Sequence, residues 1–259
     1  MQDAVCAPHQ SWITGDLDIH DVALDAGGRP VFVNTLFNCL ASLSEGYSFR
    51  PLWRPPFISR LAAEDRCHLN GLATTAGQSH YVTCVSRSDA VDGWRDKRSG
   101  GGIVLEVTSG RVVAERLSMP HSPRLHDGRL WLLNSGEGQF GWVDIGTGKL
   151  HPVAFCPGYA RGLAFAGKFT VIGLSLARET RTFQGLGLDH ALSGKGTEAR
   201  CGLLIVDTET GDTVEWVRIE GVVRELFDVA VLPGIRCPSL IGLKGDDVLR
   251  VLSIDGEIE

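Results

Sequence analysis

The chain has 259 residues, enough for one large domain or two ordinary ones. Its 25 basic and 31 acidic side chains give a net charge of −6, which argues against nucleic-acid and anionic-membrane partners. No apolar run approaches the roughly 20 residues of a membrane span, and the first ten residues predict no secretory signal. The seven cysteines are widely spaced and form no CxxC pair, so we expect reduced thiols and a cytoplasmic location.

Glycine is abundant, with 32 residues, which indicates many tight turns and therefore many short strands. A short phrase of a polar residue and a following apolar stretch recurs at intervals of 40 to 66 residues. Its five copies start at His20, Asn70, His121, Arg161 and Phe227. Repetition with a period of roughly 40–50 residues is typical of propellers and other repeat folds.

In chain order, the repeat units begin near residues 18, 68, 119 and 159, and each continues through further apolar runs. The second runs are 30–36, 81–85, 130–133 and 169–174, the third are 103–107, 140–145 and 203–206, and the fourth are 112–117, 151–155 and 213–219. Apolar residues alternate within 213–219, which fits a strand better than a helix. Four short antiparallel strands per unit predict the blades of a β-propeller.

A last unit begins near residue 225 and offers only three strands, at 226–232, 239–243 and 248–254. A lone strand at 11–14 would complete it and close the ring. We therefore predict an all-β chain that forms a single propeller domain over residues 1–259, with five four-stranded antiparallel blades. A β-sandwich or two small β domains is the alternative.

Several longer motifs resemble the DUF4915 family of bacterial proteins, which has propeller-like repeats. The resemblance extends from about residue 11 onward and rests on the runs TGDLDIHD (14–21), WRPPFIS (53–59), CHLNGLA (67–73), MPHSPR (119–124), FCPGYARG (155–162) and EARCG (198–202). Members usually carry a further N-terminal stretch of about one blade, which implies six blades if that blade is missing here. The resemblance implies a fold rather than an activity.

The first strand of each propeller blade lines the central channel, so the residues that start these strands should converge at one mouth. Besides the five repeat starts, the positions two residues upstream lie on the same strand face. These are Asp18, His68, Met119, Tyr159 and Glu225. Three of the chain's eight histidines therefore fall at two equivalent positions of the repeat.

We predict a metal site formed by His20, His68, His121 and Glu225, because imidazoles and a carboxylate are ligands for Zn, Fe, Mn or Ca. The predicted catalytic residues are Arg161, Asp18 and Asn70. Arg161 would hold an anionic substrate through two hydrogen bonds, and Asp18 or Asp21 would orient an imidazole. Alternatively, the same polar side chains only satisfy strand ends in a wet channel.

Two long connections, 86–102 and 176–200, are candidate lids over this mouth. They would contribute Arg87, Trp94, Arg178, Arg181 and Lys195, and a short helix is expected at 188–193. Cys67 and His68 are an unlikely nucleophile pair, because adjacent strand residues point to opposite faces.

Two functions follow from this pattern. The first is a metal-dependent enzyme that acts on a small polar or anionic molecule at the channel mouth. The alternative is a non-catalytic scaffold that recognises a peptide or protein partner through loops on its top face. A third possibility is a fragment of a longer propeller with no activity of its own.

Overall fold

The computed structural model describes residues 3–176, 185–252 and 254. By their contacts the residues divide into two compact units, Thr14–Val231 and a smaller one made of Met1–Ile13 and Leu232–Glu259. In the described part of the chain, no helix combines the length and the apolar character needed to cross a bilayer.

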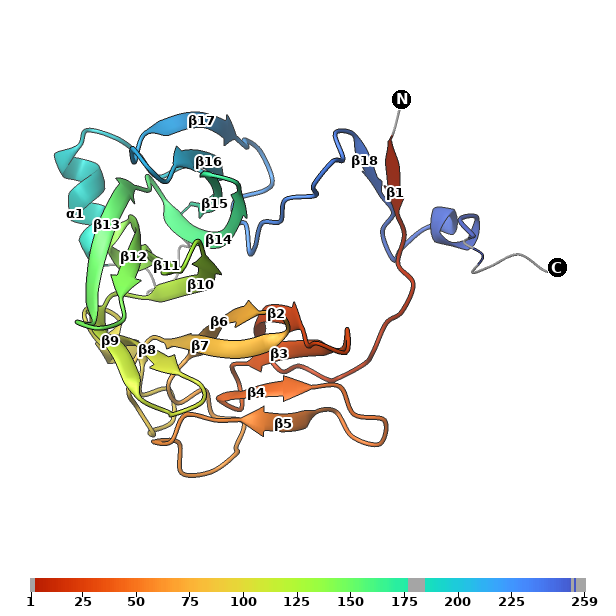
Figure 1. Cartoon of the computed structure of the whole chain (residues 1–259), viewed down its shortest axis with the longest axis horizontal. Coiled ribbons are helices and arrows are strands. Elements are labelled where there is room, and N and C mark those ends of the chain that lie inside the picture. Colours follow the sequence, from red (N-terminus) through yellow and green to blue (C-terminus); the bar gives the residue numbers. More distant parts are fainter. Residues whose placement is uncertain (1–2, 177–184, 253, 255–259) are drawn as a thin grey trace. The chain divides into compact units, whose positions relative to one another are not determined.

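The larger unit contains four separate four-stranded antiparallel sheets, each built from consecutive strands (Figure 1). This arrangement confirms the all-β prediction of blade-like units and excludes a two-sheet sandwich. The strands are β2 (Ile19–Leu24), β3 (Pro30–Asn34), β4 (Cys39–Ser42) and β5 (Arg50–Trp53); β6 (Leu69–Thr75), β7 (Gln78–Cys84), β8 (Gly102–Glu106) and β9 (Val112–Leu117); β10 (Pro120–His126), β11 (Arg129–Asn134), β12 (Gln139–Asp144) and β13 (Lys149–Phe155); β14 (Tyr159–Ala166), β15 (Phe169–Ser175), β16 (Gly202–Asp207) and β17 (Thr213–Arg218).

The described helical segments of the larger unit lie in the connections between its strands. The 3₁₀ turn η1 (Arg95–Lys97) lies in the β7–β8 loop and η2 (Ser135–Glu137) follows β11. The helix α1 (Gly187–Gly194) lies in the β15–β16 connection, where the sequence predicts a short helix.

Apolar layers between neighbouring sheets form the core. Strand β11 shows the pattern: Leu130 and Leu132 pack toward the second sheet, whereas Trp131 and Leu133 pack toward the fourth. Side chains alternate between the two faces of a strand, and both faces of this sheet are covered. The run is therefore apolar throughout instead of alternating with polar residues.

The first strands β2, β6, β10 and β14 pack one against the next and lie toward the middle of the four sheets (Figure 1). Each of them contains a register shift near its start, for example between Ile19 and Val22 in β2 and between Ala160 and Leu163 in β14. Such bulges turn side chains away from the regular alternation. His20, Asn70 and Arg161 lie within these bulges.

Arg124 of β10 connects the first strands of three sheets. Its guanidinium donates to Asp21 Oδ2 of β2 at 2.8 Å and to the Leu72 carbonyl of β6 at 3.1 Å, and it lies 3.6 Å from Asp228. The Asp21 side chain is only 5% exposed and also accepts the Leu72 N–H. The prediction that Asp21 could orient an imidazole is therefore wrong, because its carboxylate is bound by Arg124 and the backbone.

The last repeat differs from the prediction. Segment 226–232 forms no strand, although it runs beside the fourth sheet, where the Leu226 N–H donates to Ser175 Oγ at 2.9 Å. Residues 11–14 form no strand either. The described residues thus contain four four-stranded sheets where five blades are predicted.

In the smaller unit, β18 (Pro238–Leu240) pairs in parallel with β1 (Ala4–Cys6), and η4 (Asp246–Leu249) is a 3₁₀ turn where the sequence predicts the end of a blade. Pro233 and Pro238 lack the N–H that an interior strand must donate. Both lie just outside the predicted strands at 226–232 and 239–243, and Pro238 is the first residue of β18.

Replacing Arg124 by Met should lower the free energy of unfolding by about 3 kcal/mol or more, because it leaves the buried Asp21 carboxylate without its charged partner. Urea unfolding would measure the change. Arg29→Met is the matched control, since the Arg29 side chain is 73% exposed in its pair with Asp25 and should cost under about 1 kcal/mol. Equal effects of the two substitutions would contradict a central role for Arg124.

Candidate functional site

Residues in the left-handed backbone conformation precede the bulges and shape the site. Asp18, His68 and Met119 occupy equivalent repeat positions and have φ values of 50°, 50° and 48°. In two of the repeats this turns a carbonyl back toward the following histidine. The Asp18 carbonyl lies 2.9 Å from His20 Nδ1, and the Met119 carbonyl lies 2.9 Å from His121 Nδ1.

These contacts fix the tautomer of each imidazole. A carbonyl oxygen only accepts, so Nδ1 of His20 and of His121 must carry the hydrogen and Nε2 keeps the lone pair. His68 reaches the same tautomer through a side chain, since its Nδ1 lies 2.9 Å from Asp65 Oδ2. Thr35 adds a second contact to His20 Nδ1 at 2.9 Å.

Asp18, His20 and His68 form a compact triad that we call the HHD triad. One potential ligand atom from each residue lies within 4.8 Å of the others. The two imidazole rings meet edge to face at 4.8 Å, and His20 Nδ1 is 3.5 Å from Asp18 Oδ1. Two imidazole nitrogens and one carboxylate are a donor set that suits zinc, iron and manganese.

The electrostatics of the triad favour neutral imidazole at His20. The pKa of His20 is lowered to about 2, mainly by burial and also by the charges of His68 and Arg161. The pKa of Asp18 is raised, mainly by burial, while His68 and Arg161 act against that shift. The Arg161 charge therefore reaches both ligands, although Arg161 belongs to the fourth sheet.

The described contacts of His121 are with Met119 and Asn70 and not with the triad. Its Nε2 lies 3.3 Å from Asn70 Nδ2, and Asn70 Oδ1 accepts the Thr83 hydroxyl at 2.7 Å, which fixes the amide orientation. Burial is the largest cause that lowers the pKa of His121 to about 3. Because Asn70 donates to the only lone pair of this imidazole, His121 lies outside the HHD triad.

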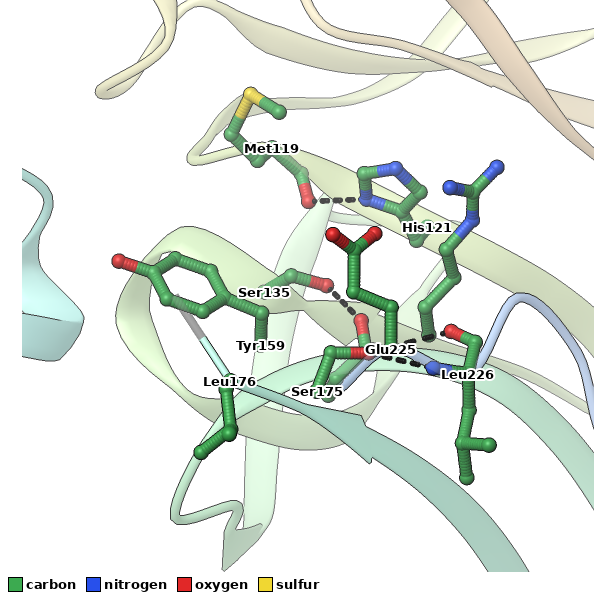
Figure 2. A pocket seen from close by; sticks show the side chains of 10 residues that line it. Met119, His121, Ser135, Tyr159, Ser175, Leu176, Glu225 and Leu226 are labelled. Atoms are coloured by element: carbon green, nitrogen blue, oxygen red, sulfur yellow. Dashed lines mark hydrogen bonds between the residues drawn. The ribbon is translucent and has the colours of Figure 1, made fainter. Parts of the chain in front are cut away.

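A cavity beside the triad is lined by three of the four remaining predicted residues (Figure 2). His121, Arg161 and Glu225 line it, together with Ser175 and Tyr159, and its volume is about 40 Å³. In Figure 2 the Glu225 carboxylate points toward the His121 imidazole. Of the seven predicted site residues, three form the triad and three line this cavity, and the seventh, Asn70, contacts His121 of the cavity wall.

The two long connections, 86–102 and 176–200, contribute unequally to the site. Trp94 of the β7–β8 loop is buried against His68, with ring centroids 4.1 Å apart, whereas Arg87 of the same loop lies over Phe57. Lys195 stacks on Phe155. Arg178 and Arg181 lie outside the described residues.

Cys67 is not a nucleophile. It is fully buried, and burial together with its contact to Cys84 raises the pKa of its thiol well above the usual range.

Asp65 and Thr35 contact the histidines but were missed in the sequence. Asp65 stands three residues before His68, and this D-x-x-H spacing is a local signal that could have been noticed. Thr35 directly follows β3, the strand that pairs with β2 in the first sheet. No sequence feature links it to His20.

Fold and cluster together define a repeat protein of four-stranded β-sheets, with histidine and carboxylate side chains gathered at the starts of its first strands. The family model described as "Domain of unknown function (DUF4915)" matches residues 1–241. The chain belongs to this family, as its motifs suggested.

No curated protein matches the chain. Among solved structures, a protein of unknown function from Bacteroides caccae is 14% identical with a TM-score of 0.48, over 79% of this chain and 63% of that one. Hydrazine synthase from Kuenenia stuttgartiensis is 12% identical with a TM-score of 0.47, over 78% of this chain and 49% of that one. Glutaminyl cyclase from Myxococcus xanthus is 14% identical with a TM-score of 0.44, over 80% and 78%.

The chain spans less than two thirds of the length of the first two structures. All three scores lie below 0.5, so the description of the fold rests on the sheets of the chain itself.

The depressed pKa of His121 predicts a pH-dependent stability. Its folded-state pKa of about 3 lies below the unfolded value of 6.5, so only the unfolded state gains the proton as the pH falls between these values. Stability should therefore drop toward acid, by at most about 1.4 kcal/mol per pH unit. Urea unfolding of wild type and His121→Gln between pH 7.5 and 4.5 should show a shallower acid loss in the variant. Parallel pH profiles would contradict the assignment.

Proposed function

We propose that the larger unit binds a divalent transition metal through the HHD triad and acts on a small anionic substrate held by Arg161. The observation that supports this most strongly is the shared Nδ1–H tautomer of His20 and His68. It leaves the Nε2 lone pair of each imidazole available to a ligand, and one potential ligand atom from each of Asp18, His20 and His68 lies within 4.8 Å of the others.

The donor set narrows the choice of metal. Calcium prefers six to eight oxygen ligands, whereas two imidazoles and one carboxylate suit zinc, iron or manganese. Three protein ligands leave further coordination positions open, as in catalytic sites. A metal bound there would supply an activated water as nucleophile.

Arg161 supports an anionic substrate. It lines the cavity beside the triad, and its guanidinium lies over the Phe227 ring at 4.5 Å. A guanidinium offers the planar pair of donors that carboxylates and phosphates accept. Its charge already acts on Asp18, His20 and His121, so an anion near it would lie close to the metal ligands.

Metal binding is tested by titrating Zn²⁺ and Mn²⁺ into chelator-treated protein and measuring heat. Wild type should bind one equivalent, and His20→Ala, His68→Ala and Asp18→Ala should each weaken binding about 100-fold or more, since each removes one of three ligands. His190→Ala is the matched control, because His190 is exposed on α1 and distant in sequence from the triad.

His121→Ala separates the two possible ligand sets. It should leave metal affinity within a few-fold of wild type, provided that circular dichroism shows a folded variant. A loss as large as that of His20→Ala would instead support the set of His20, His68, His121 and Glu225. If wild type binds no metal, the proposal fails and the peptide-binding scaffold becomes the better hypothesis.

Anion binding is tested with inorganic phosphate and the zinc-loaded protein. Arg161→Met should weaken phosphate binding about tenfold or more, because charge-assisted hydrogen bonds contribute roughly 1.5–3 kcal/mol, while zinc affinity stays near wild type. Arg129→Met is the control, since Arg129 stacks on Trp142 in the third sheet. Equal phosphate affinity in all three proteins would contradict the role of Arg161.

A further inference from the structure

The His68 imidazole is held on three sides. Asp65 Oδ2 accepts its Nδ1–H at 2.9 Å, the Trp94 indole stacks on its face at 4.1 Å and 27°, and the His20 ring meets it edge to face. Trp94 also donates its indole N–H to the same Asp65 oxygen at 2.8 Å. Trp94 is 2% and His68 9% exposed, so packing leaves the imidazole little freedom to rotate.

His68 needs this arrangement because it occupies a different repeat position from the other two histidines. His20 and His121 donate to the carbonyl of the left-handed residue two positions earlier. His68 is itself the left-handed residue of its repeat. The Asp65 carboxylate takes the place of that carbonyl and gives the same Nδ1–H tautomer.

The loop that carries Trp94 is fixed to the residues around Asp65. The Asp92 N–H donates to the Glu64 carbonyl at 3.2 Å, and Arg66 forms an ion pair with Asp89. Together with the hydrogen bond from Trp94 to Asp65, these contacts mean that the three consecutive residues 64–66 each bind this loop. The loop is therefore a fixed wall against His68 rather than a segment poised to close.

The hydrogen bonds of Asp65 are not those expected of a residue that only stabilises the fold. Its Oδ1 is buried and has no hydrogen-bond partner among the described residues. A buried oxygen without a partner destabilises the fold. The carboxylate is thus arranged for the two donors on Oδ2, of which one is the metal-ligand candidate His68.

We propose that Asp65 and Trp94 are positioning residues of the metal site, which hold His68 as its Nδ1–H tautomer with Nε2 available to a metal. This inference rests on the proposed function and adds residues from outside its ligand set. A carboxylate bound to Nδ1–H fixes ring orientation and raises the basicity of the ligating nitrogen. Trp94 holds the carboxylate in place through the second hydrogen bond.

The tautomer can be tested without metal. A long-range ¹⁵N–¹H correlation spectrum, recorded near about pH 8.5 where unperturbed imidazole is neutral, should show His68 as the Nδ1–H form. Its signals are assigned by their loss in His68→Gln. In Asp65→Asn the spectrum should shift toward a mixture of tautomers or the Nε2–H form. An unchanged Nδ1–H pattern in Asp65→Asn would overturn the proposal.

Metal affinity gives the second readout, by Zn²⁺ titration of folded variants. Asp65→Asn should weaken binding about 10- to 100-fold. Trp94→Phe, which keeps an aromatic ring but loses the indole N–H, should weaken it by a smaller factor. Asp92→Asn is the matched control on the same loop, since its side chain pairs with the exposed Arg95, and it should bind like wild type.

The two readouts separate two kinds of failure. If wild type binds no zinc while Asp65→Asn changes the His68 tautomer, the metal function fails but the positioning by Asp65 stands. If wild type binds zinc and both Asp65→Asn and Trp94→Phe bind it within twofold of wild type, the positioning role is overturned. Should Asp65→Asn not fold, Trp94→Phe decides by the same twofold criterion.

Discussion

The close packing of the four first strands is the constraint on which the site depends. Glycine is required where β6 meets β10 and where β14 meets the segment after the fourth sheet: a Cβ on Gly71 would lie 2.4 Å from Cδ of Pro123, and one on Gly162 would lie 2.7 Å from the Asp228 backbone. Real Cβ atoms do not come this close to their neighbours. The strand starts can therefore meet at the centre, and their polar side chains converge with them.

Convergence also removes these side chains from water, which explains their charge states. Two cations, Arg124 and Arg161, lie among the first strands, and the buried Asp21 carboxylate compensates the first of them. An additional imidazolium near Arg161 would be both desolvated and repelled. His20 and His121 consequently stay neutral, which is the state in which an imidazole can accept a hydrogen bond or ligate a metal.

The sequence predicted the repeats well because strand order within a blade is local. Each unit start lies within one residue of the observed first strand, and the second, third and fourth runs match strands of the sheets. The last repeat was not predictable from its apolar pattern, since 226–232 reads like 159–166 but forms no strand of a sheet. The candidate site was only partly predictable, because the contacts of Thr35 with His20 and of Asn70 with His121 join residues far apart in the sequence, which the repeat pattern does not relate.

Equivalent repeat positions need not have equivalent chemistry. His20 and His121 share the same repeat position, the same Nδ1 contact and a similarly depressed pKa. They differ in their neighbours: the Nε2 of His121 contacts the amide of Asn70 from the preceding sheet, whereas the His20 ring meets the His68 ring edge to face. Local backbone geometry thus fixes the tautomer, and the residue on the neighbouring first strand decides whether the lone pair is used in the fold or left for a ligand.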